Sequence, residues 1–347
     1  MNKLTKVGCS ALCGSLAAIS AANAGDMTVT GGVDMSWQML SGGNAGNPIG
    51  LGSNLTFKGS GELDNGWKFD LTVANANKNA YSASNVNLDM GGLGQLNIDH
   101  GDSGNGIAAF DDKMPTAWEE AWGNGLGTGV KLVVGSGASM SVMYTTPTFL
   151  GTTFTVTRAF EAGAENTADK SSTLAENNYD DGSWDLTNNV NPSFGTEALT
   201  GLNMYVGGHS KNAGNGAASD YYEGVAGMTF DIGPISLGAA RTGHIMGTGV
   251  TATKVSHYTG LMYGVAFNVN DDLSVSYGYV ESRKAGYVNG SVAMPAEANR
   301  RIEVESLQVA YSLGGASIRV AETKGENLYF SSTNDQDATT VSVSLAF

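Results

Sequence analysis

The stretch Ala338 to Phe347, ATTVSVSLAF, alternates between two kinds of side chain. Its apolar residues Val341, Val343, Leu345 and Phe347 fall on one face, and small, mostly polar residues fall between them. Because successive side chains of a strand point to opposite faces of the sheet, this pattern predicts a strand with one apolar side. A regular small face opposite the apolar one fits a barrel wall between lipid and water. We therefore expect the chain to end on an outer-membrane type of strand.

The first 24 residues have the features of a secretory signal peptide. Lys3 and Lys6 are followed by the mostly apolar run 7–19 and then by Ala22-Asn23-Ala24, the usual order of n-region, h-region and cleavage site. We expect cleavage after Ala24, which leaves residues 25–347 as one β-barrel domain. Both cysteines lie in the signal segment. The exported chain then has no disulfide, and a closed ladder of backbone hydrogen bonds can stabilise it instead.

The charge balance is strongly acidic. The full chain has 18 Lys+Arg and 33 Asp+Glu, a net charge of −15, and removal of Lys3 and Lys6 with the signal leaves −17. This excess would repel nucleic-acid phosphates, which argues against a nucleic-acid partner. After the signal segment, no apolar run approaches the roughly 18 residues that a spanning helix requires. A membrane location would therefore depend on strands.

Alternating segments recur at a spacing of about 20 residues, which fits tilted strands of about 10 residues plus their connections. Sixteen strands are expected, near 28–40, 51–63, 67–75, 83–90, 95–100, 130–144, 152–160, 184–192, 202–210, 221–230, 235–246, 256–269, 273–284, 302–313, 316–323 and 338–347. Tight Asp-, Asn- and Gly-rich turns alternate with longer polar loops, as in outer-membrane barrels. A soluble β-sandwich also alternates, but aromatic residues near strand ends favour the barrel. The prediction is an all-β, transmembrane antiparallel barrel of about sixteen strands.

Four segments resemble the Gram-negative general diffusion porins, particularly the sixteen-stranded alphaproteobacterial type. They are GDMTVTGGVDMSW at 25–37, LTFKGSGELDNGWKFDLTV at 55–73, GQLNIDHGDSGNG at 94–106 and VSVSLAF at 341–347. The resemblance spans the whole chain after the signal, through the order and spacing of these motifs. It implies a homotrimeric channel in the outer membrane of a Gram-negative bacterium, in contact with lipid and lipopolysaccharide. Ions and small hydrophilic solutes would pass through it by diffusion.

In that family the third long loop folds inward and narrows the pore, and the corresponding connection here is 101–129. It carries five acids and one lysine: Asp102, Asp111, Asp112, Glu119, Glu120 and Lys113. The functional interpretation is an acidic edge of the constriction, and the alternative is a solvated surface loop. Trp118 and Trp122 are four residues apart, as on one face of a short helix, which indicates that this part of the loop docks against something.

Bases on the wall opposite such acids would set a transverse field across the pore. Lys58, Lys68 and Arg319 fall on the polar phase of their strands and are the candidates. Lys58, in mid-strand, is the best of them, whereas Lys68, near a tight turn, and Arg319 could each be simply a solvated lumen residue. Members of the family often have several arginines clustered on this wall, and this chain has no clear cluster, which weakens the expected field. We therefore expect a weak preference for cations.

The sequence has no catalytic or cofactor motif. It contains no P-loop, G-x-S-x-G elbow or dinucleotide fingerprint. Its histidines, His100, His209, His244 and His257, are not spaced as metal ligands are. We expect no enzyme activity, no cofactor and no metal site, although Asp180-Asp181 could bind a divalent ion rather than being merely solvated. Two other interpretations stay open: a barrel for adhesion, display or envelope structure, and a substrate-selective porin.

Overall fold

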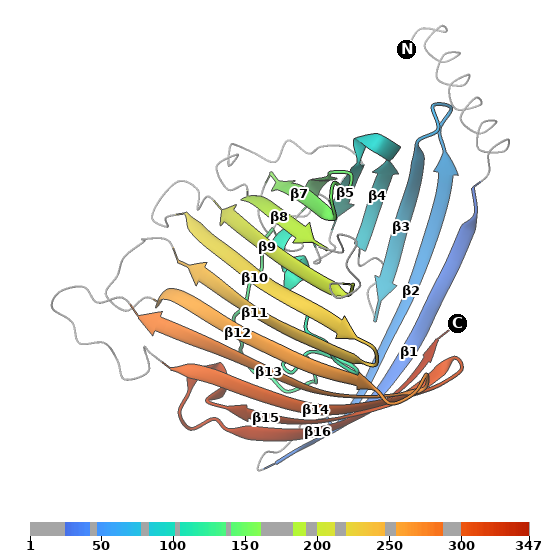
Figure 1. The fold of residues 1–347 in the computed structure, drawn as a ribbon. Coiled ribbons are helices and arrows are strands. Elements are labelled where there is room, and N and C mark those ends of the chain that lie inside the picture. Colours follow the sequence, from blue (N-terminus) through green and yellow to red (C-terminus); the bar gives the residue numbers. More distant parts are fainter. Residues whose placement is uncertain are drawn as a thin grey trace, which may run out of the picture.

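The computed structural model describes residues 25–41, 47–77, 83–100, 105–136, 140–160, 183–191, 200–211, 220–246, 255–286 and 300–346. The predicted signal segment, Asp102, Asp180-Asp181 and Phe347 lie outside these ranges. Sixteen antiparallel strands form one closed barrel, in which β1 pairs with β16 (Figure 1). None of the short helices in the described part of the chain could span a bilayer.

The strands and short 3-10 helices of the described ranges follow one another along the chain in a simple order. They are β1 Met27–Leu40, β2 Ile49–Glu62, β3 Lys68–Ala76, β4 Ala83–Asp89, η1 Gly91–Leu93, β5 Gln95–His100, η2 Gly106–Phe110, β6 Ser141–Thr145, β7 Thr152–Ala159, β8 Ser183–Val190, β9 Leu202–Lys211, β10 Tyr221–Ile232, β11 Ile235–Ile245, β12 Val255–Asn268, β13 Leu273–Gly286, β14 Arg301–Leu313, β15 Ala316–Glu326, η5 Leu328–Phe330 and β16 Gln336–Ala346. The predicted count of sixteen strands is confirmed.

The sixth predicted strand, 130–144, was wrong over its first part because β6 begins only at Ser141. Residues 130–136 belong to the third loop, which therefore extends beyond the predicted end at 129. Leu132 and Val133 are buried against the inner wall, and the N–H groups of Lys131, Val134 and Gly135 bond to wall side chains rather than to a neighbouring strand. For example, Lys131 N donates to Ser282 Oγ at 3.1 Å. An alternating pattern cannot distinguish burial under a wall from burial within a sheet.

Cross-strand register fixes which side chains face the lumen. On β2 and β3, Lys58 lies opposite Thr72 and Glu62 lies opposite Lys68, so these polar side chains share one face. The other face carries Phe57 and Leu71, which are 40% and 44% exposed. Large apolar side chains exposed on the outer wall, with polar ones inside, are the arrangement of a membrane barrel.

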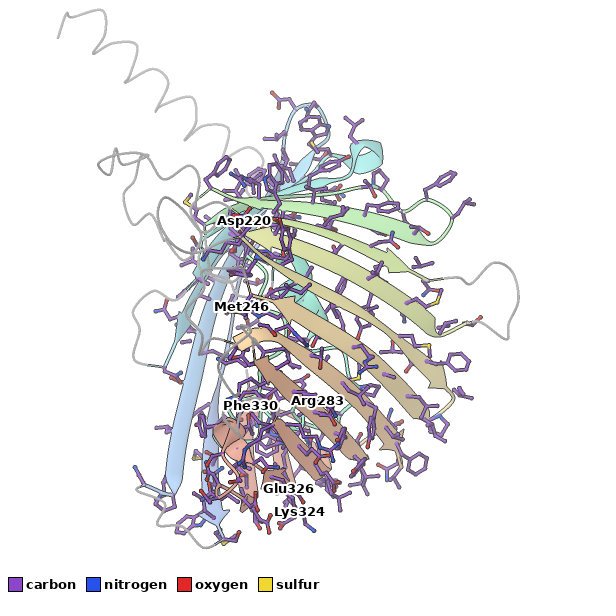
Figure 2. All side chains as sticks on the ribbon, turned by 90° about the vertical axis from the view of Figure 1, so that its left-hand side faces the viewer. Asp220, Met246, Arg283, Lys324, Glu326 and Phe330 are labelled. Carbon is purple, nitrogen blue, oxygen red and sulfur yellow. The ribbon has the colours of Figure 1, made fainter. Side chains whose placement is uncertain are left out.

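On β13 to β15, the outer face changes from apolar to charged towards the long loops. Arg301 forms ion pairs with Glu281 at 3.2 Å and with Glu303 at 2.9 Å. Figure 2 shows Arg283, Lys324 and other charged side chains near the same end of the barrel. This change marks the level at which the strands leave the lipid-facing apolar band.

A cluster of buried apolar residues lies inside the barrel, between the third loop and the wall. The loop contributes Ile107, Phe110, Met114, Ala121, Leu126, Leu132 and Val133, and the wall contributes residues that include Tyr205, Val225, Met262, Val280, Ile302 and Val304. Burying one large apolar side chain contributes about 1.5–3 kcal/mol. The apolar face of the loop therefore holds it in the lumen, and its polar edge is left facing water.

Candidate functional site: the third loop inside the barrel

The third loop runs along the inner wall towards β16 and then returns to β8. On its outgoing leg Pro115 passes β12 at Gly264, where a Cβ atom would lie only 2.6 Å from the Pro115 carbonyl oxygen. At its far end the carbonyl of Asn124 accepts hydrogen bonds from Thr340 at 2.9 Å and Gln38 at 3.3 Å. The loop therefore lies along the inner wall from β8 round to β1.

The remaining arc of the wall borders open space. A cavity of about 730 Å³ is lined by residues of β2 to β5 and by the start of the chain. Lys58, Lys68 and Asp70 are among its lining residues. Water and solutes therefore have room beside this arc.

Wall side chains fix the middle of the loop. The N–H groups of Trp118 and Glu119 donate to Oε1 of Gln308 on β14 at 3.0 and 3.1 Å, and the N–H group of Ala117 donates to Ser276 on β13 at 2.8 Å. Residues 115–123 form bends and turns rather than a helix, so the expectation that this segment has one helical face was wrong. The expectation that this segment docks is confirmed, because the guanidinium of Arg319 lies 5.0 Å from the ring centre of Trp118.

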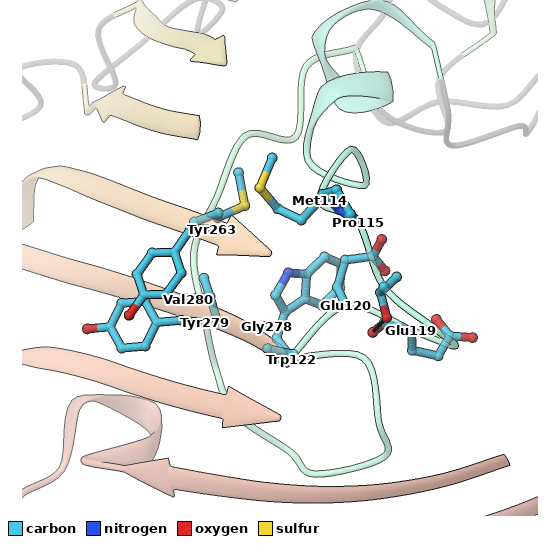
Figure 3. Close-up of a pocket in the computed structure, with 12 residues that line it drawn as sticks. Met114, Pro115, Glu119, Glu120, Trp122, Tyr263, Gly278, Tyr279 and Val280 are labelled. Carbon is cyan, nitrogen blue, oxygen red and sulfur yellow. Dashed lines mark hydrogen bonds between the residues drawn. The ribbon is translucent and has the colours of Figure 1, made fainter. Parts of the chain in front are cut away.

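Four loop acids lie close enough together to affect one another. Burial, with repulsion from Asp112 and Glu120, raises the pKa of Asp111 to about 7. Burial raises the pKa of Glu120 to about 7 as well, assisted by Asp112 and Glu119. Burial also raises the pKa of Asp112 and of Glu119, and Arg319 opposes the rise at Glu119. Figure 3 shows Glu119 and Glu120 on the side of the loop away from Tyr263 and Tyr279.

A family model described as Gram-negative porin matches residues 8–347, nearly the whole chain. The chain belongs to the Gram-negative porin family. It is an outer-membrane β-barrel channel for passive diffusion, which confirms the predicted class and location. No curated protein sequence matches this porin significantly.

Solved structures share the fold at low sequence identity. The OmpF of Salmonella typhi, in complex with daunomycin, has a TM-score of 0.67 and 14% identity over 93% of this chain and 98% of that one. An anion-selective porin from Comamonas acidovorans has a TM-score of 0.64 and 16% identity over 93% and 99%. The OmpT of Vibrio cholerae, in a trimer form, has a TM-score of 0.63 and 11% identity over 93% and 99%.

The three predicted bases lie in two different places in the porin. Arg319 lies beside the loop, where it pairs with Asp34 on β1 and donates to Ser342 at 3.0 Å. Lys58 lies on the open arc and forms an ion pair with Asp70 at 3.3 Å. Lys68 lines the same cavity as Lys58. Only Arg319 is therefore placed directly among the groups that act on the loop acids.

Sequence reasoning missed the wall residues that hold the loop. Gln308, Asp185 and Glu223 bond to its backbone, and Asp185 and Glu223 each lie beside a histidine. Asp185 and Glu223 could have been identified from the sequence, because each is an acid on the lumen-facing side of its strand with no lysine or arginine nearby in sequence. Across the described ranges, no three potential metal ligands come together.

Proposed function

We propose that this porin is weakly cation-selective and that Asp111, Asp112, Glu119 and Glu120 on the third loop set the preference. The proposal rests on a difference in ion pairing between these loop acids and the bases of the wall. Among the described residues, these four carboxylates form no ion pair, whereas the bases Lys58 and Arg319 are paired with Asp70 and Asp34. An unpaired acidic edge beside a water-filled passage raises the local cation concentration. We call this loop the constriction loop.

The sign of selectivity has to come from charges rather than from the fold. The porin of Comamonas acidovorans is described as anion-selective although it shares this architecture. Asp112 and Glu119 are the exposed members of the acidic set, so passing ions would interact most directly with them. In the same proposal, Lys58 and Lys68 belong to the opposite wall and Arg319 moderates the charge of Glu119.

Reversal potentials in a salt gradient test this proposal. The Asp112→Asn/Glu119→Gln variant should lose most of the cation preference, and adding Asp111→Asn and Glu120→Gln should remove the rest. The matched control, Asp271→Asn/Asp272→Asn, removes two exposed acids from a short turn and should change it little. The native preference should also fade between 0.1 and 1 M salt, as the Debye length falls from about 10 to about 3 Å. Anion preference in the native channel would overturn the proposal.

The proposal includes a homotrimer that exchanges ions and small hydrophilic solutes without catalysing a reaction. The trimer form of the Vibrio cholerae OmpT supports the assembly by analogy. Gel mobility without heating, together with cross-linking, tests it, and a strictly monomeric species in mild detergent would reject it. We also propose that residues 1–24 are removed on export, which the mass of the mature protein can check.

The outer surface suggests where the lipid partners lie. The charged residues at the long-loop end of β13 to β15, among them Arg283, Arg301 and Lys324, lie beyond the apolar band. We place lipopolysaccharide head groups at this level and acyl chains against the apolar band below it.

A further inference from the structure

Four ionisable side chains of the inner wall alternate between acids and histidines across neighbouring strands. Asp185 of β8 lies opposite His209 of β9, His209 lies opposite Glu223 of β10, and Glu223 lies opposite His244 of β11. Nδ1 of His209 is 3.3 Å from Oδ2 of Asp185, and Nδ1 of His244 is 3.1 Å from Oε1 of Glu223. We call these four residues the acid–histidine row.

The two acids of the row hold both ends of the constriction loop. Oδ1 of Asp185 accepts the N–H of Ile107 at 3.1 Å on the outgoing leg, and Oδ2 accepts the hydroxyl of Ser136 on the returning leg. Oε2 of Glu223 accepts the N–H groups of Val134 at 3.0 Å and Gly135 at 2.7 Å. The loop is therefore fastened where its two legs meet the wall.

These carboxylates need polar partners inside the wall. The side chains of Asp185, His209 and Glu223 are 0% exposed, and within the described ranges neither acid is paired with a lysine or arginine. Burying a carboxylate costs several kcal/mol unless hydrogen bonds and a partner offset it. Apart from the backbone and hydroxyl groups of the loop, each acid has an imidazole Nδ1 atom beside it, 3.3 Å away at Asp185 and 3.1 Å away at Glu223. The ring of Tyr221 packs 5.7 Å from the ring of His209 and 5.1 Å from that of His244.

We infer that His209 and His244 are positioning residues for permeation: they keep Asp185 and Glu223 available as acceptors for the backbone of the constriction loop, and so fix the shape of the pore. The inference rests on the proposed role of this loop as the constriction. It does not depend on the sign of the selectivity.

Removing both imidazoles tests the inference. In the His209→Leu/His244→Leu variant, amide hydrogen exchange over 130–136 should be at least about tenfold faster, the loss of about 1.4 kcal/mol of protection, while exchange in β14 and β15 stays native. The open-channel current should become noisier. His209→Asn/His244→Asn, which keeps an amide donor near the Nδ1 position, should restore both readouts. Native exchange and noise in the leucine variant would overturn the inference.

A reducible disulfide between the returning leg and β8 tests whether holding the loop in place reverses the effect of the leucine variant. The hydroxyl oxygens of Ser136 on the returning leg and Ser183 on β8 are 2.9 Å apart, and both native cysteines lie in the signal segment. Adding Ser136→Cys/Ser183→Cys to the leucine variant and oxidising the pair should restore native exchange and current noise, and reduction should abolish the rescue. Equal behaviour of the oxidised and reduced forms would reject a positioning role.

A change on the loop side keeps the inference testable if the leucine variant fails to fold. Gly135 has φ +60°, and a Cβ atom there would lie 2.7 Å from Oδ1 of Asp185, so Gly135→Ala should displace the returning leg. Gly66→Ala is the matched control, because Gly66 has φ +83° but nothing within 4 Å of its Cβ position. Faster exchange over 130–136 in Gly135→Ala alone supports the inference, and native exchange there rejects it.

The proposal on selectivity and the inference on loop anchoring can be rejected independently of each other. An unchanged reversal potential in the loop-amide variants would reject the acidic selectivity but leave the exchange and noise results of the histidine variants standing. Native exchange and noise in the histidine variants would reject the anchoring and leave the acidic selectivity standing.

Discussion

The carboxamide of Gln308 forms hydrogen bonds with both backbone groups of Glu119. Oε1 of Gln308 accepts the N–H of Glu119 at 3.1 Å, and Nε2 donates to the carbonyl of Glu119 at 2.6 Å. One wall side chain thus satisfies both backbone groups of a loop acid. Because Gln308 is 1% exposed on the inner face of β14, its own orientation is fixed by packing. The backbone from which the Glu119 side chain extends is therefore held by a residue of the barrel.

Gln308→Leu should free this part of the constriction loop without opening the barrel. Leaving a buried donor or acceptor unpaired costs about 1–3 kcal/mol, which is enough to shift the loop from its native position. We expect an altered single-channel conductance, a weaker cation preference and an unchanged β-sheet spectrum. Ser312→Ala, at a position on the same face of β14 near the short turn, is the control. A native conductance in Gln308→Leu would show that the apolar contacts alone position the loop.

Selectivity should depend on pH near neutrality. The pKa of Asp111 and that of Glu120 are raised to about 7, so both carboxyls are largely neutral at pH 6 and largely ionised at pH 8. Cation preference should therefore increase as pH rises through this window and decrease on acidification. Reversal potentials measured from pH 5.5 to 8.5 test this, and Asp111→Asn/Glu120→Gln should flatten that part of the profile. A flat native profile would contradict it.

The strands could be predicted because lipid and water impose an alternation of period two along each of them. In β3, for example, Phe69 and Leu71 alternate with Asp70 and Thr72, so the lumen face followed directly from the sequence. The same reasoning placed Lys58 and Arg319 on the inner wall. Only the roles of these residues then remained to be determined from their neighbours.

The docking of the loop could not be predicted in the same way. His209 and Asp185 are neighbours only because of the register between β8 and β9, which neither local sequence contains. Residues 130–136 were predicted as part of a strand, but the burial of Leu132 and Val133 comes from packing against the inner wall. Contacts between segments far apart in sequence decide such cases, and a single sequence does not specify them.

Arg319→Gln should increase the cation preference of the channel. The substitution removes a positive charge beside the loop and leaves the Asp34 carboxylate without its base. These two effects favour cations, and we expect them to exceed the opposing effect, since loss of Arg319 also removes an influence that lowers the pKa of Glu119. Arg319→Lys keeps the charge but replaces a planar group that stacks on Trp118, and the two side chains are not equivalent at such sites. We therefore expect a selectivity change in Arg319→Gln alone and a change in tryptophan fluorescence in both variants. Equal reversal potentials for all three proteins would place Arg319 outside the permeation path.

The pair Lys58 and Asp70 should behave as a neutral unit in permeation. Their charged atoms are 3.3 Å apart on the open arc of the wall, so each largely cancels the field of the other. Lys58→Gln should shift the reversal potential towards cations, and Asp70→Asn should shift it towards anions.

The double variant Lys58→Gln/Asp70→Asn should return close to the native value. Two opposite charges in water at this separation interact by about 1 kcal/mol, so each single change should alter the permeability ratio by a few-fold at most. A double-mutant cycle of reversal potentials in 0.1 M salt measures all three effects. A double variant whose reversal potential stays far from the native value would show that the two charges do not compensate each other, and that the open arc carries a field of its own.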